Sequence, residues 1–177
     1  VLASLRWPGR PDLPAGNAAW TYMIEHPFGD FALFVGELPV GGEGAPTRVQ
    51  PFEVWVNGAE QPRGLGAMAK TLSMDMRAND PAWLTLKLDA LATVAEERAF
   101  EMRFPPHGER RPFPGVVAAT AAVIRWRCEQ LGALSAKGPT PVLDAMFSRD
   151  EPRTGTSGTL AWSADIDNPA TGELMTL

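Results

Sequence analysis

Arginines alternate with aromatic residues between positions 96 and 115, and no other segment gathers as many side chains that could bind a ligand. Its candidate binding residues are Arg98, Arg103, His107, Arg110 and Arg111. Guanidinium groups among phenyl rings can hold a phosphate or a protein surface. Glutamates match the arginines one for one, however, so no net positive field attracts nucleic acid. We weigh a solvated loop against a binding site, for which a partner protein is a more natural target than a nucleic acid.

Other chemical motifs in the sequence are incomplete. His26 and His107 lie beside proline or glycine, without the second histidine or the carboxylate spacing of a metal motif. The segment "GGEGAPTR" lacks the Gly-Lys-Ser/Thr end of a phosphate-binding loop. "DIDNPATG" begins like a calcium loop, but Ala170 and Thr176 occupy the places of its glycine and glutamate. We therefore expect no metal site.

Cys128 is the single cysteine of the chain, which excludes an internal disulfide, a CxxC redox pair and a cysteine-rich zinc site. It falls on the apolar stripe of an expected helix, where a cysteine usually behaves as a small buried hydrophobe. No G-x-S-x-G nucleophile motif is present either. We therefore assign no catalytic residue, leave open whether the chain belongs to an enzyme, and expect a reducing, cytoplasmic setting.

The charge balance restricts the class of partner. The net charge is -5, and nucleic-acid affinity comes largely from clustered Lys and Arg. The most apolar run, residues 115–124, is far shorter than the roughly 20 residues that span a membrane. We expect neither a nucleic acid nor a membrane as a partner.

The stretch "QPFEVWVNG" has the clearest strand pattern in the chain. Its alternation places Phe52, Val54 and Val56 on one face, predicted to be the core face. The opposite face carries Glu53, Trp55 and Asn57 and is a possible partner surface. We expect the N-terminal arm or the C-terminal tail to cover Trp55, whereas a bare tryptophan would indicate a docking face.

Periodicity predicts the elements that position these residues. Strands are expected at 20–26, 30–38 and 52–57, and residues 98–104 form a further strand or a loop. Helices are expected at 65–76, 81–91 and 113–131. Asp80 is predicted to cap the second helix and Gly132 to end the third.

These elements predict an α+β fold with a small antiparallel sheet of three to four strands and about three helices packed on one face. The domain organisation follows from the distribution of proline and glycine. Residues 1–19 are expected to form an extended arm, residues 20–134 a single domain, and residues 135–177 a short helical turn and a flexible tail.

The order of several segments resembles a known family. "PFEVWVN", then a helix ending in "MDMRAND", then "PAWLTLKLDAL" resemble the accessory C-terminal region of class II, adenosylcobalamin-dependent ribonucleotide reductases. "RPDLPAGNAAWTYMIEHPFGDFALFVGEL" upstream and "MRFPPHGERRPFPGVVAATAAVIRWRCEQLGAL" downstream extend the resemblance over most of residues 10–134. In some of these enzymes the region is a separate small subunit.

The resemblance implies a non-catalytic accessory domain or subunit that docks on the catalytic chain of such a reductase. Adenosylcobalamin is implied only on that catalytic chain, so we expect no cofactor on this one. Residues 51–57 correspond to the family's core strand, and Arg77 is a matching residue without an assigned role. A C-terminal cysteine pair for relaying electrons is absent, which favours a structural or regulatory role. The alternative is a stand-alone nucleotide- or protein-binding module with the same fold.

Overall fold

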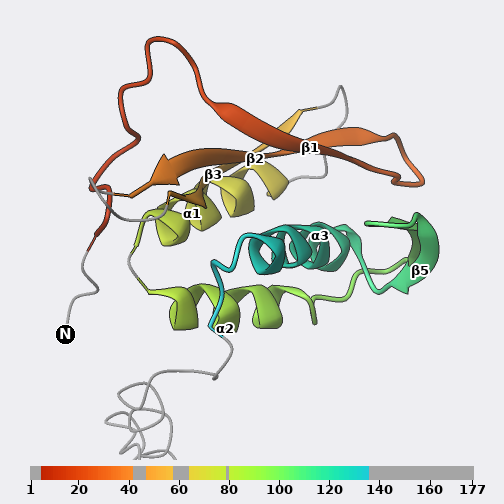
Figure 1. Ribbon diagram of the computed structural model, residues 1–177. Coiled ribbons are helices and arrows are strands. Elements are labelled where there is room, and N and C mark those ends of the chain that lie inside the picture. The colour runs from red at the N-terminus through yellow and green to blue at the C-terminus, as the bar shows by residue number, and fades with distance from the viewer. Residues whose placement is uncertain (1–4, 42–46, 58–63, 79, 136–177) are drawn as a thin grey trace, which may run out of the picture. The chain divides into compact units, whose positions relative to one another are not determined.

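The computed structural model describes residues 5–41, 47–57, 64–78 and 80–135. The chain divides into two units, Val1–Asp144 and Ala145–Leu177, and the expected helical turn and tail lie outside the described residues. The first unit holds two antiparallel sheets and three helices (Figure 1). The predicted α+β class is therefore confirmed.

The larger sheet has three antiparallel strands in sequence order: β1 (Ala18–Ile24), β2 (Phe31–Val40) and β3 (Arg48–Asn57). Each pairs with its chain neighbour, as short connections favour. β-branched and aromatic residues are frequent in the β1–β2 hairpin, and Gly29 takes a left-handed conformation (φ 135°) in its turn. The three predicted strands are confirmed with different ends: β1 begins and ends two residues earlier than expected, β2 ends two residues later, and β3 begins four residues earlier.

A bulge interrupts the register between β2 and β3. Gly36 pairs with Glu53 and Glu37 with Pro51, which leaves Phe52 without a partner in β2. Phe52 consequently packs against Trp7 of the N-terminal arm, with ring centroids 6.2 Å apart. Phe52 is fully buried, as predicted, but the extra residue interrupts the two-residue alternation that was expected to place it in one row with Val54 and Val56.

Local sequence accounts for the three helices, α1 (Leu65–Arg77), α2 (Pro81–Leu91) and α3 (Val116–Gln130). The Asp80 carboxylate accepts a hydrogen bond of 2.9 Å from the amide of Trp83, which confirms the predicted N-cap. Gly132 adopts φ 63° just after α3, the left-handed conformation expected at its end.

The helices lie on one side of the larger sheet, in two layers (Figure 1). α1 packs on β3 and α3 on β2, whereas α2 packs on α3 and α1. The core between these layers contains fully buried side chains from every layer, among them Leu33, Val35, Leu72, Leu88 and Ile124. The expected one-sided packing is thus confirmed for the sheet, with α2 as an outer layer.

A buried ion pair ties β2 to α3. Two nitrogens of Arg127 donate to the two carboxylate oxygens of Glu37, at 2.6 and 2.9 Å. Both side chains are largely shielded, with 22% and 10% exposed respectively. The guanidinium also lies 5.6 Å from the ring centre of Trp20 on β1. One arginine therefore joins a helix to two strands.

Residues 98–104 do contain a strand, but it does not join the larger sheet. β4 (Phe100–Phe104) pairs with β5 (Glu109–Phe113) in a separate two-stranded sheet. β5 was not predicted, because "ERRPF" is charged and contains a proline, which are features of a loop. Tyr22 of β1 donates a hydrogen bond of 2.9 Å to the carbonyl of Arg103 and so fastens the hairpin to β1.

Candidate functional site

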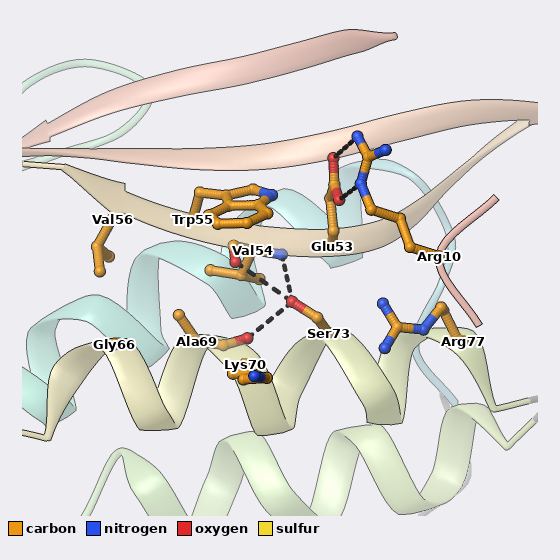
Figure 2. A pocket seen from close by; sticks show the side chains of 10 residues that line it. All are labelled: Arg10, Glu53, Val54, Trp55, Val56, Gly66, Ala69, Lys70, Ser73 and Arg77. Carbon is orange, nitrogen blue, oxygen red and sulfur yellow. Dashed lines mark hydrogen bonds and ion pairs between the residues drawn. The ribbon is translucent and has the colours of Figure 1, made fainter. Parts of the chain in front are cut away.

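A groove of about 440 Å³ lies between the edge strand β3 and helix α1 (Figure 2). Val54, Trp55 and Val56 supply its wall on β3. Its size is in the range of pockets that bind small molecules or short chain segments. Most of the exposed lining is apolar, with charged side chains at the rim. This combination is typical of recognition sites rather than of a packing defect.

The α1 side of the groove follows from helical periodicity. Gly66, Ala69, Lys70, Ser73 and Arg77 recur at spacings of three and four and so lie on one face of the helix. The neighbouring stripe of Leu65, Ala69, Leu72 and Met76 enters the core. The spacing of these residues is thus a signal for the groove in the sequence, next to the apolar spacing that predicts the helix.

Ser73 closes the bottom of the groove. Its hydroxyl accepts a hydrogen bond of 2.8 Å from the amide of Val54 and donates to the carbonyl of Ala69, also at 2.8 Å (Figure 2). The Val54 carbonyl lies 3.2 Å from the same oxygen. An edge strand normally presents such groups to water. Here Ser73 accepts from the Val54 amide and covers the Val54 carbonyl, which keeps α1 against β3.

Trp55 is 57% exposed and lies at the mouth of the groove. The described residues of the N-terminal arm do not cover it, and the C-terminal tail, the other segment expected to do so, lies outside the described residues. The N-terminal arm instead covers Phe52 and Glu53, because Arg10 pairs with Glu53 and Trp7 contacts Phe52. Asn57, the third residue of the predicted partner face, is exposed at the end of β3.

Glu53 belongs to an internal ion pair and not to an open surface. Its carboxylate accepts from Arg10 at 2.7 and 3.2 Å, and the Glu53 residue is only 4% exposed. Arg10 also donates to the side chain of Asn17 at 3.3 Å. The hydrogen bond and charge of Glu53 raise the pKa of Arg10 above its ordinary value. The pair anchors the arm at one end of the groove.

The arginines predicted as binding residues are distributed over the β4–β5 hairpin. Arg103 and Arg110 lie opposite each other in the register and both contact Glu25, which follows β1. The hydrogen bond from Arg103 lowers the pKa of Glu25. Arg111 lies on the other face, 4.4 Å from the ring centre of Phe104.

The remaining two candidates lie elsewhere on this unit. His107 is exposed in the β4–β5 turn, and Arg98 is exposed before β4, near His26 and Phe28. The five side chains thus do not converge on one described cavity. Arg103, Arg110 and Arg111 have contacts that hold the hairpin together, and a ligand role for the cluster stays a prediction.

Cys128 is fully buried on α3, in the core cluster. Burial raises the pKa of its thiol to about 12, chiefly because a thiolate would lose its hydration there. The reactive form of a cysteine is the thiolate, so this side chain is unsuited to nucleophilic or redox work.

We expect iodoacetamide to leave the folded chain unmodified at about pH 8 and to alkylate it once guanidinium unfolds it. Mass spectrometry of both samples measures this with one possible site, because Cys128 is the single thiol. Folding stability should also decline above the ordinary thiol pKa of 9.0, as pH rises toward 12, because only the unfolded thiol then ionises. Rapid alkylation of the native chain would contradict the buried placement.

No group of three or more His, Cys, Asp or Glu side chains that could hold a metal occurs among the described residues. In the same part of the chain, no helix combines the length and apolarity needed to cross a membrane. No protein-family model, curated protein or solved structure matches this chain.

Proposed function

We propose that this chain is a non-catalytic accessory domain or subunit of an adenosylcobalamin-dependent ribonucleotide reductase. It acts by docking on the catalytic chain, which binds the cofactor and reduces ribonucleotides. The segments that resemble this family supply β3, α1 and α2. Two of those elements form the groove, and the segments quoted for the resemblance contain residues 53–56 and Arg77 of its lining.

The observation that carries the proposal is the exposure of Trp55 beside an apolar groove. Tryptophan is enriched among the residues that contribute most to protein interfaces, and leaving it in water forgoes a large burial energy. The described residues offer no thiolate or metal cluster as an alternative source of function. A docking role accounts for the exposed Trp55 and the apolar groove beside it.

Co-purification tests this proposal. We expect the tagged chain to retain the catalytic reductase chain of the same organism, and a Trp55→Ala variant to retain much less of it. Phe28→Ala is the matched control, because Phe28 is 65% exposed but lies outside the groove. If the wild-type chain neither retains the reductase nor changes its activity, the accessory role is wrong.

A stand-alone binding module is the second candidate, and the cationic rim of the groove favours it. Lys70 and Arg77 flank a cavity large enough for one nucleotide. Nucleoside di- or triphosphates would then raise the melting temperature in a concentration-dependent manner. No shift up to about millimolar nucleotide would remove this alternative.

A further inference from the structure

We propose that the groove between β3 and α1 binds an extended, acidic segment of a partner protein. In this arrangement Trp55 packs on an apolar side chain of the segment, and Lys70 and Arg77 pair with its carboxylates. The inference deepens the proposed docking function by giving the chemistry of the docked segment. Its binding test does not require the reductase.

Charge is the first argument. The groove lining contains three cations, Arg10, Lys70 and Arg77, and one carboxylate, Glu53, in a chain whose net charge is -5. Arg10 is neutralised by Glu53. The ion pairs found among the described residues include neither Lys70 nor Arg77. An acidic ligand therefore meets a local positive potential on an otherwise acidic protein.

The spacing of the two cations favours a peptide over a single nucleotide. Lys70 and Arg77 are seven residues apart on one helix face, which separates their backbone positions by about 10 Å. Acids two or four residues apart in an extended chain project from one side at about 7 or 13 Å, a range that long flexible side chains bridge. The phosphates of one nucleotide lie closer together than this.

The backbone of the edge strand determines how the segment is held. The amide of Val54 already donates to Ser73, whose hydroxyl also lies 3.2 Å from the Val54 carbonyl, so a peptide cannot extend the sheet at that residue. Beside Val54, recognition comes from side chains: an apolar residue against Trp55, Val56 and Ala69, and acids on the α1 rim (Figure 2). This arrangement differs from strand addition, in which main-chain hydrogen bonds supply the affinity.

Fluorescence anisotropy provides the test. The probe is a labelled nine-residue peptide that alternates glutamate with leucine. The charge-reversed control peptide alternates lysine with leucine. We expect the purified chain to bind the glutamate peptide and to prefer it over the lysine peptide. The double variant Lys70→Glu, Arg77→Glu should bind the glutamate peptide about tenfold or more weakly than the wild-type chain does. Raising the salt from about 50 to 500 mM should weaken binding of this peptide by the wild-type chain.

Controls separate the groove from the rest of the surface. Trp55→Ala should also weaken binding, whereas Phe28→Ala, outside the groove, should not. An unchanged melting temperature shows that the groove variants fold. The inference is overturned if the two peptides bind equally, if neither binds up to about millimolar concentration, or if the groove variants bind as well as the wild-type chain. Displacement of the peptide by adenosine triphosphate at lower concentration overturns it in favour of a nucleotide site.

The two proposals can fail separately. If the reductase co-purifies but the Lys70→Glu, Arg77→Glu variant still retains it, the accessory role stands and the acidic-segment inference is wrong. If the glutamate peptide binds as expected but no reductase co-purifies, the groove chemistry stands and the accessory role is wrong.

Discussion

Replacing Arg127 with leucine is expected to lower the free energy of unfolding by about 3 kcal/mol, because it leaves the Glu37 carboxylate buried without its counter-charge. The variant also loses the contact between the guanidinium and the Trp20 ring. Urea denaturation followed by circular dichroism measures the change through its midpoint and slope.

Arg125→Leu is the matched control for this prediction. Arg125 lies on the same helix and pairs with Asp89 and Glu129, whose side chains are 55% and 46% exposed. Exposed pairs of this kind contribute at most about 1 kcal/mol. The double variant Glu37→Leu, Arg127→Leu should regain part of the loss, since it removes both charges. An Arg127→Leu variant no less stable than Arg125→Leu would contradict the structural role of the pair.

Replacing Gly36 with alanine is expected to destabilise the chain by about 2 kcal/mol and to release the N-terminal arm. A Cβ atom there would lie 2.5 Å from Cγ of Glu53 and 3.1 Å from Cε1 of Phe52. Glu53 cannot move aside without disturbing its hydrogen bonds to Arg10. The arm amides of Arg6 and Trp7, which donate to the carbonyl of Arg77, should then exchange faster with deuterium.

Gly66→Ala is the control for the glycine substitution. A Cβ on Gly66 meets nothing within 4 Å, and the residue lies in α1, where alanine is preferred to glycine by up to about 1 kcal/mol. This variant should be as stable as the wild type or slightly more so. If Gly36→Ala behaves in the same way and the arm amides stay protected, the close packing of Glu53 on Gly36 does not constrain the arm.

The candidate site was only partly accessible from sequence. Trp55 was identified as a residue that could mark a partner surface, and its exposure leaves that interpretation in place. The cations on α1 were not identified as part of a site, because a lysine and an arginine on a helix usually form a solvated face. They became candidates once the structure placed α1 beside the edge of β3.

The sequence by itself determines the helices, because their signals lie between residues close together in the chain. The apolar period of three and four residues forms α1, the Asp80-Pro81 pair begins α2, and Gly132 follows the end of α3. Each of these signals acts between residues a few positions apart. Their outcome therefore depends little on the rest of the fold.

Tertiary structure alone decided the pairing of β5, the bulge at Phe52 and the part of the sheet that the arm covers. These features depend on partners far apart in sequence, such as Glu53 with Arg10 and Glu37 with Arg127. Such partners are chosen by competition for buried space and counter-charges, which no short window of sequence records. The same competition decides that Trp55 stays exposed on β3 while the arm covers Phe52 and Glu53.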